Sequence, residues 1–434
     1  MTAVPEIIDG LPDEWEVLKL GEAYEFSKKP RSLEIRDKDI VPFIPMDLIS
    51  EGSKSVKGWQ IKKMSEVTSG TFVLKNDLMI AKITPSFENG KQAILDNLPQ
   101  DYGYATTEVW SIHPKNNHYL SDYLFNYIRI PEVRHSMATK MEGATGRQRL
   151  PRNVLESQLI AFPPLSEQKK IASVFLALQE SKEKTENVLS ALKELKKSMM
   201  KHLFTYGAVP IEQISSVKLK ETDIGLMPEK WDSIILGDVC SLLQYGTSNR
   251  CDDDSSKTPV LRIPNIVNGR VYIADLKYMK PTDIEMVRLK LKVGDVVFVR
   301  TNGRRDRIGR CAIFNDELKE CLFASYLIRA QLMMDKMLPA YLLYYTLTTQ
   351  GRNYFEDKSS KAADGKYNIN QQTIKNLPCP LPQLHEQQKI VNILSTIDGK
   401  IEAEENKKNS LDALFKTLLS LLMTGKMRVN NLEI

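Results

Sequence analysis

The sequence has few of the residues that build metal centres and disulfide frameworks. Its 434 residues include five cysteines, all in the second half of the chain and none in a C-x-x-C pair, and five scattered histidines. This usage predicts neither a zinc site nor a disulfide framework. No stretch reaches the roughly 18 apolar residues of a membrane span, and segment 1–15 carries acids where a signal peptide needs a basic start and an apolar run. We therefore expect a cytoplasmic chain with reduced thiols and no membrane contact.

Motifs of the common nucleotide-dependent and DNA-modifying enzymes are also missing. A methyltransferase needs a glycine-rich loop and an Asn or Asp before two prolines and an aromatic residue, but FPPL at 162–165 lacks the acid or amide. An ATPase needs a phosphate-binding loop, and Gly90-Lys91 lacks its upstream glycine, so it is typical of a turn. The acidic run Asp252–Asp254, flanked by serines, favours a solvated loop over a metal site. The sequence predicts no catalytic residue, no cofactor and no metal.

Length and charge set wider bounds. A chain of 434 residues exceeds the size at which single cores stop growing, about 250–300 residues, so we expect two or more domains. Its hydrophobic residues (42%) and charged residues (26%) are in the ordinary balance of an ordered globular protein. The net charge of +5 permits a nucleic-acid partner without requiring one.

An internal repeat organises the whole chain. The segment PPLSEQKKIASVF at 163–175 is matched by PQLHEQQKIVNIL at 382–394, an offset of 219 residues. Upstream, in the same order, GKQAI matches GRCAI and GRQRL matches GKYNI, and near the front Trp15 matches Trp231 at an offset of 216. Such ordered self-similarity predicts a tandem duplication.

Each repeat has a mixed part followed by a helical part. The mixed parts, roughly 10–162 and 225–381, contain short runs of Val, Ile, Phe and Tyr broken by Gly, Pro and Asn, which predict strands and turns. Within them, 118–130 and 337–350 have helical spacing. The helical parts, 165–204 and 384–423, carry apolar residues along an approximate heptad seam. We expect the two helices to pair through Ile171, Val174, Leu178, Val188, Leu192, Leu195, Met199, Ile390, Ile393, Ile397, Leu411, Leu414, Leu418 and Leu421.

The two predicted helices have clear ends and a length that requires a packing partner. Prolines precede both starts, Gly207 and Gly425 follow both ends, and about 40 residues correspond to ~60 Å. The first helix leads from one mixed part to the other and the second begins there, so pairing along their lengths must be antiparallel, with the mixed parts at opposite ends. Polar stretches at Ser181–Glu186 and Lys400–Lys408 then meet near the centre. A poorly packed, solvated waist is the alternative.

Basic loops are the candidates for DNA contact. Segment 300–310, RTNGRRDRIGR, suits both phosphate contact and guanine recognition, while its repeat partner 81–91 is far less basic, so the two copies are expected to read differently. A second loop pair, 141–153 and 361–373, has glycines that allow close backbone approach. A third, short basic segment is KKPR at 28–31. The alternatives are a basic hairpin without a ligand for 300–310, a structural turn for the second loop pair, and a solvated face for 28–31. The candidate residues are Arg300, Thr301, Asn302, Arg304, Arg305, Arg307, Arg310, Lys366, Tyr367, Asn368, Lys28, Lys29, Arg31, Lys82, Lys91, Arg147, Gln148 and Arg149.

The segments PLSEQKKIA (164–172) and QLHEQQKIV (383–391), in an order of mixed part, helix, mixed part, helix, resemble the specificity subunits of type I restriction-modification systems. The resemblance spans nearly the entire chain. It implies an α+β fold with two globular α/β target recognition domains alternating with two long helices that pair as an antiparallel coiled coil, a pseudo-twofold tandem repeat. The expected divisions are 1–162, 163–208, 209–381 and 382–434, the second and fourth being spacer helices.

The resemblance also implies a function. Each target recognition domain would read one half of a split, asymmetric site in double-stranded DNA, and the helix pair would set the unread gap. The chain would catalyse nothing itself, but would dock two modification (methyltransferase) subunits, which flip the target adenine, and through them restriction subunits. Self-association is expected for the isolated chain. The rivals are a coiled-coil scaffold with peptide-binding modules and a stand-alone enzyme such as a nuclease.

Overall fold

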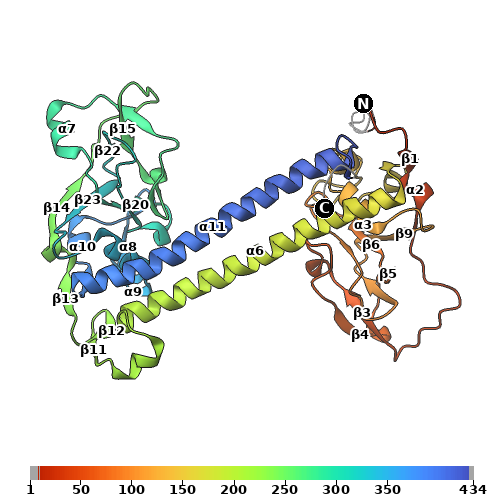
Figure 1. The fold of residues 1–434 in the computed structure, drawn as a ribbon, viewed down its shortest axis with the longest axis horizontal. Helices are drawn as coiled ribbons and strands as arrows, with labels where there is room; N and C mark the ends of the chain where they lie inside the picture. The colour runs from red at the N-terminus through yellow and green to blue at the C-terminus, as the bar shows by residue number, and fades with distance from the viewer. Residues whose placement is uncertain (1–7, 9, 430–434) are drawn as a thin grey trace. The chain divides into compact units, whose positions relative to one another are not determined.

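The computed structural model describes residue 8 and residues 10–429 (Figure 1). These residues form two compact units, which we describe separately: unit 1 holds the residues up to Val188 and those from Glu404 onward, and unit 2 is Leu189–Ala403. The predicted divisions follow sequence texture, whereas packing divides the chain within both long helices. The extremities of the predicted first and last segments, at 1–7, 9 and 430–434, lie outside the described residues.

The described residues of unit 1 form three sheets. Its strands are β1 (Glu16–Lys19), β2 (Tyr24–Phe26), β3 (Ile40–Ile44), β4 (Gln60–Lys63), β5 (Thr71–Leu74), β6 (Leu78–Ala81), β7 (Gln92–Ile94), β8 (Tyr102–Ala105), β9 (Val109–Pro114) and β10 (Leu159–Phe162). The strand orders are β2-β9-β6-β7, β4-β3-β8-β5 and β1-β10. All four residues of β6 are buried. The strand therefore has a continuous apolar sequence instead of an alternating one.

Short helices and one part of each long helix complete the main core of unit 1. The short helices are α2 (Leu20–Ala23), α3 (Ser121–Tyr127), α4 (Pro131–Ala138) and α5 (Arg152–Glu156). Tyr123 and Tyr127 of α3 are fully buried, and the Tyr123 hydroxyl donates to the carbonyl of Ala161 at 2.6 Å. The same core includes Ile171 and Leu422 from the two long helices. Unit 1 is thus closed by segments from both ends of the chain.

Unit 2 repeats this plan with additions. Its strands are β11 (Leu219–Thr222), β12 (Gly225–Pro228), β13 (Asp232–Ile235), β14 (Cys240–Tyr245), β15 (Thr258–Leu261), β16 (Ile266–Val267), β17 (Gly269–Val271), β18 (Lys277–Met279), β19 (Val296–Val299), β20 (Thr301–Asn302), β21 (Cys311–Ile313), β22 (Leu322–Phe323), β23 (Leu327–Leu332), β24 (Ser360–Lys361), β25 (Tyr367–Asn368) and β26 (Pro378–Leu381). Its short helices are α7 (Asp283–Leu289), α8 (Pro339–Leu347), α9 (Thr349–Lys358) and α10 (Gln371–Lys375).

The sheet topology confirms the duplication. The order β14-β23-β19-β21 in the six-stranded sheet of unit 2 corresponds to β2-β9-β6-β7 in unit 1, and β13-β26 corresponds to β1-β10. Likewise β15 pairs in parallel with β22, as β3 does with β8. Among the runs of Val, Ile and Phe that predict strands are β5, β6 and β19, and the two predicted short helical segments contain α3 and α8.

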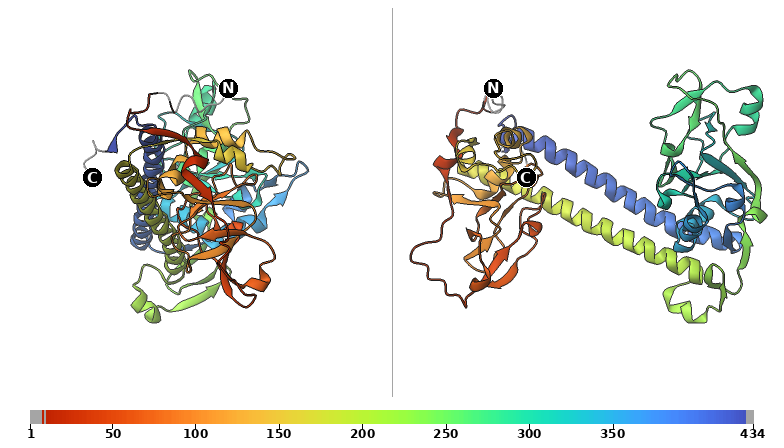
Figure 2. Two further views of the ribbon diagram at one scale, coloured as in Figure 1. Left: turned by 90° about the vertical axis from the view of Figure 1, so that its right-hand side faces the viewer. Right: turned by 180° about the vertical axis from the view of Figure 1, so that it is seen from behind.

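Two long helices run without interruption, as Figures 1 and 2 show: α6 (Leu165–Tyr206) and α11 (Leu384–Met423). Both end close to the predicted residues, each before a glycine with positive φ, +83° at Gly207 and +68° at Gly425. These are backbone conformations that favour glycine at a helix end.

The α6 and α11 segments pair antiparallel in each unit. In unit 1 the Lys182 ammonium lies 2.6 Å from the Asp412 carboxylate, and Glu186 lies 2.8 Å from Lys408. In unit 2 Lys196 lies 2.6 Å from Asp398. Partner numbers fall on α11 as they rise on α6, which confirms the antiparallel prediction. The Glu186–Lys408 pair joins the two predicted polar stretches.

The observed heptad seam differs from the predicted one at six positions, of which three are exposed and three are half-buried. Val188, Leu195 and Leu414 are 44%, 47% and 44% exposed, so they do not form the seam. The seam residues are at least half-buried and alternate at spacings of four and three: Ile171, Phe175, Leu178, Lys182, Thr185, Leu189, Leu192, Lys196, Met199 and Leu203 on α6, and Ile390, Leu394, Ile397, Ile401, Glu404, Lys408, Leu411, Phe415, Leu418 and Leu422 on α11. Val174, Ile393 and Leu421 lie half-buried beside it. Because some seam positions are polar, such as Lys196, the apolar pattern predicted the adjacent residue, such as Leu195, in their place.

A glutamine fastens the start of each long helix to its unit. Buried Gln168 accepts a hydrogen bond from the Leu120 amide and donates to two carbonyls, those of His118 and Pro163. Gln387 does the same, accepting from the Leu338 amide and donating to carbonyls of the same loop and of the helix start. The repeated Glu-Gln pair in the sequence therefore marks a structural attachment.

Candidate nucleic-acid interface

In unit 2 the structure brings the two predicted DNA-contact loops together. Strand β20, in the first loop, pairs with β25 in the second, with Thr301 opposite Asn368 and Asn302 opposite Tyr367. The backbone amide of Ile369 also donates to the carbonyl of Arg300 at 2.9 Å. Loops 300–310 and 361–373 thus form one surface, which we call the unit 2 platform.

An arginine cluster covers one part of the unit 2 platform. The Arg304 guanidinium binds the Asp306 carboxylate through two hydrogen bonds of 2.9 Å, and Arg310 lies 3.5 Å from the same group. The hydrogen bonds from Arg304 lower the pKa of Asp306. Arg305 donates to a backbone carbonyl of α9 at 2.7 Å, while Arg307 is exposed. Arg304 and Arg310 share Asp306, and Arg305 lies 3.8 Å from Asp357, so the arginines of the cluster outnumber the carboxylates beside them. The cluster is therefore suited to phosphate contact.

Two predicted contact residues of this platform are held by the protein instead. Thr301 is buried, because side chains alternate between the two faces of a strand and its face points inward. The prediction that it contacts DNA is therefore corrected to a structural position. Arg300 packs over the Tyr245 ring, 4.9 Å from its centroid, and donates to the Ser325 carbonyl at 3.4 Å. On the second loop, exposed Lys366 pairs with Asp364 at 3.0 Å.

Unit 1 builds the same platform from its own loops. The Thr84 amide donates to the Gln148 carbonyl at 3.0 Å, and the Leu150 amide donates to the Lys82 carbonyl at 2.7 Å. Ile83 and Arg149 form an antiparallel bridge. Loops 81–91 and 141–153 are therefore joined in the way their repeat partners are joined in unit 2.

The side chains on the unit 1 platform differ in charge from those of unit 2. Arg149 forms two hydrogen bonds to the Glu108 carboxylate, of 3.0 and 2.7 Å, and these lower the pKa of Glu108. The Lys82 ammonium lies 4.1 Å from the centroid of the Trp110 ring, and burial lowers its pKa. The unit 1 platform thus presents an arginine paired with a glutamate, whereas the unit 2 platform presents an excess of arginines. This difference is in line with the expectation that the two copies recognise different DNA sequences.

The remaining predicted residues are bound to the protein itself, lie outside the joined loops, or are exposed on them. The Lys91 ammonium donates to the Met46 carbonyl at 3.1 Å, so it serves the protein's own backbone. Lys28, Lys29 and Arg31 are exposed between β2 and β3, and no contact with the platform is seen among the described residues. Arg147 is exposed on the platform loop itself.

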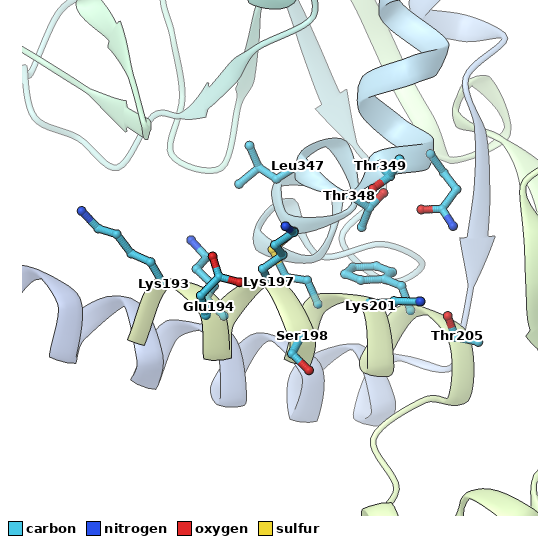
Figure 3. Close-up of a pocket in the computed structure, with 13 residues that line it drawn as sticks. Lys193, Glu194, Lys197, Ser198, Lys201, Thr205, Leu347, Thr348 and Thr349 are labelled. Carbon is cyan, nitrogen blue, oxygen red and sulfur yellow. The ribbon is translucent and has the colours of Figure 1, made fainter. Parts of the chain in front are cut away.

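Unit 2 also contains a basic groove that the sequence did not reveal. It lies between α6 and the α8–α9 junction and has a volume of about 730 Å³. Figure 3 shows Lys197 and Lys201 on α6 across from Leu347, Thr348 and Thr349. Its floor includes apolar side chains of α6. A groove with a lysine rim and an apolar floor is suited to an acidic, amphipathic surface.

Comparison with known proteins identifies the family to which this chain belongs. The sequence matches the family described as "Type I restriction modification DNA specificity domain" at residues 12–204 and again at 228–413. The chain belongs to this specificity family. It is 25% identical to the type I restriction enzyme MjaVIII specificity subunit of Methanocaldococcus jannaschii, over 98% of this chain and 95% of that protein. It is 22% identical to the EcoEI specificity subunit of Escherichia coli, over 95% and 82% of the two chains.

The fold agrees with that assignment. The solved type I restriction-modification S subunit from M. genitalium superimposes with a TM-score of 0.59 at 14% identity, over 95% of this chain and 96% of that one. Membership of the specificity family confirms the predicted α+β architecture and a recognition subunit as opposed to an enzyme. Within residues 10–429, no helix is long and apolar enough to cross a membrane, and no cluster of His, Cys, Asp or Glu suited to a metal is found.

Four side chains that shape the platforms of this specificity chain were not predicted from the sequence: Glu108, Trp110, Tyr245 and Tyr326. The prediction selected basic residues on glycine-containing loops, and none of these four residues is of that kind. A signal was nevertheless present, because Glu108 and Tyr326, 218 residues apart, each directly precede an apolar segment that forms equivalent strands, β9 and β23.

Proposed function

We propose that the chain is the sequence-specific DNA-recognition subunit of a type I restriction-modification complex, with the platform of each unit reading one half of a two-part site. The observation that carries this proposal is the duplicated platform. Two loops distant in sequence are joined in the same register in both units, while the exposed side chains differ. Such an arrangement suits a protein that reads two different half-sites with one scaffold.

The proposal includes partner subunits. Two modification subunits are expected to dock on the chain and to carry the methyl-donor chemistry, with restriction subunits joining through them. The exposed apolar residues of the long helices, Val188, Leu195 and Leu414, and the lysine-rimmed groove of unit 2 support such docking, because exposed apolar side chains on a helix favour protein contact. We assign the complex to the cytoplasm, in agreement with the five free cysteines.

DNA binding can be tested through its salt dependence. A triple variant with Arg304, Arg305 and Arg307 changed to Ala removes exposed charge from the unit 2 platform without disturbing Arg300, which packs against the protein. We expect weaker binding to duplex DNA and a reduction of up to about three in the slope of log K against log salt, one for each phosphate that is no longer neutralised.

A matched control removes the same charge elsewhere in unit 2, at exposed Arg288, Lys319 and Lys336. This control is expected to leave the slope nearly unchanged. Equal effects of the two triple variants, or wild-type binding that does not depend on salt, would instead favour the scaffold interpretation. DNA cleavage by the purified chain with Mg²⁺ alone would favour the nuclease interpretation.

Co-expression with modification subunits, followed by mapping of methylated adenines, tests recognition and partners together. The proposal predicts methylation within a two-part sequence that has an unspecified gap. Methylation of a single continuous sequence would contradict the assignment of one half-site to each unit.

A further inference from the structure

Three positions of the repeat converge on each platform. In unit 1 the amide of Lys82 donates to the Glu108 carbonyl at 2.9 Å, and the Leu150 amide returns to the Lys82 carbonyl, which places Arg149 beside Glu108. The backbone thus holds the ends of two strands and one loop at a single point. The side chains of Lys82, Glu108 and Arg149 all leave the backbone there.

Unit 2 has the same backbone arrangement with other side chains. The amide of Arg300 donates to the Tyr326 carbonyl at 3.1 Å, and the Ile369 amide returns to the Arg300 carbonyl at 2.9 Å. Tyr326 therefore stands where unit 1 has Glu108, and Asn368 stands where it has Arg149. Tyr326 is 56% exposed. The position is equivalent, accessible and chemically different in the two repeats, as expected of a site that sets specificity.

The Glu108–Arg149 pair leaves one edge of the guanidinium available. Glu108 accepts from Nε and Nη2 of Arg149, which are the donors on one side of the planar group. No described residue accepts a hydrogen bond from Nη1, and the Arg149 side chain is 57% exposed. The remaining donors on Nη1 and Nη2 point together in a fixed plane, and this fork matches the O6 and N7 acceptors of guanine in the major groove.

We propose that Arg149, oriented by Glu108, reads a guanine in the half-site recognised by unit 1. Arg149 is the contact residue and Glu108 is a positioning residue. The inference rests on the proposed function and deepens it. Glu108 also disfavours a phosphate at this point, because its carboxylate would repel the phosphate and cancels most of the charge of Arg149. Tyr326 and Asn368 cannot present a guanidinium fork, so unit 2 has a different base preference at the equivalent position.

The test is base preference at a single position. The full chain, purified with its modification subunits, is incubated with a pool of duplexes randomised in sequence, and the bound DNA is sequenced. Wild type is expected to enrich one guanine that Glu108→Gln no longer enriches, with a loss of discrimination of about 5- to 150-fold, the size of a bidentate arginine–guanine contact. Arg149→Lys keeps the charge but not the fork, and is expected to lose the same guanine.

Glu156→Gln is the matched control. It removes an equal charge and breaks another exposed arginine–glutamate pair of unit 1, that of Arg152 and Glu156 at 2.8 Å, so its base preferences should equal those of wild type. Unchanged guanine enrichment by Glu108→Gln, or a uniform loss of affinity for all sequences, would overturn the inference and leave the proposed function intact. A wild-type complex that selects no sequence would overturn both.

Discussion

The attachment of α11 by Gln387 leads to a quantitative prediction. Its side chain is fully buried and makes three hydrogen bonds: it accepts from the Leu338 amide at 2.9 Å and donates to the carbonyls of Lys336 and Pro382 at 2.8 and 2.9 Å. Replacement by leucine keeps the approximate volume and removes all three. One backbone donor and two backbone acceptors would then be buried without their partner.

The expected cost follows from these bonds. Each contributes a net ~0.5–1.5 kcal/mol, or about 1.5–4.5 kcal/mol for the three. The greater apolar burial of leucine offsets part of this loss, so Gln387→Leu should lower the free energy of unfolding of unit 2 by about 1–3 kcal/mol. In hydrogen exchange this corresponds to an increase of roughly 5- to 150-fold in the opening of amides around Leu338 and α8.

Hydrogen exchange followed by mass spectrometry provides the assay, because it reports each unit separately. The control is Gln388→Leu, one residue along, where the exposed side chain bonds only to Asn392 of the next helical turn. Gln168→Leu should shift the effect to unit 1. If Gln387→Leu and Gln388→Leu gave the same exchange rates, the proposed attachment role would be wrong.

Three further predictions concern single positions and the helices. The carboxylate of buried Asp77, which lies 3.5 Å from Nδ1 of His113, raises the pKa of this imidazole. The stability that the pair contributes is therefore present at low pH and is lost as pH rises through the folded-state pKa, above 6.5. Urea unfolding between about pH 6 and 8 should become less pH-dependent in His113→Gln, which introduces the residue that unit 2 has at the equivalent Gln331. Gly309→Ala should lower the free energy of unfolding by about 2–4 kcal/mol and lower the thermal midpoint, because φ is +71° and a Cβ would overlap the Phe355 ring. Gly303→Ala is the control on the same loop, and it should leave the thermal midpoint unchanged because the space around Gly303 is open. Removing one heptad from both α6 and α11 keeps the seam and should shorten the unread gap in methylation maps; an unchanged recognition sequence would contradict a spacing role for the helices.

The sequence predicted the fold well where the signal was periodic or repeated. The helix ends at Gly207 and Gly425 and the duplicated strands were readable because punctuation and internal similarity are properties of the chain alone. The seam was less predictable. Lys182 and Lys196 occupy seam positions because they pair with aspartates of the other helix, and Thr185 occupies one as a buried residue. An apolar heptad pattern does not include such polar residues, so it predicted exposed apolar residues such as Val188 and Leu195.

The sequence predicted which loops form the candidate recognition site, but not how their side chains are buried or paired. Basic and glycine-containing segments, together with the internal repeat, identified both loops of each platform. Their joining depends on backbone pairing between residues more than 60 positions apart, such as Thr301 and Asn368. Burial of Thr301 and the pairing of Arg149 with Glu108 are consequences of that joining. Charge density in the sequence shows which residues are basic and does not show which of them the protein already uses.

The assembly of unit 1 from residues up to Val188 and from Glu404 onward has a consequence for biosynthesis. Domains commonly fold in the order in which the ribosome makes them, at about 5–20 residues per second. Here the contiguous unit 2 is the first whose residues are all made. The earlier-made part of unit 1 waits roughly 10–40 s for the α11 segment that covers its core. During this interval the residues of the nascent α6 that pack on α11, such as Phe175, whose ring centroid lies 5.2 Å from that of Phe415, lack this partner.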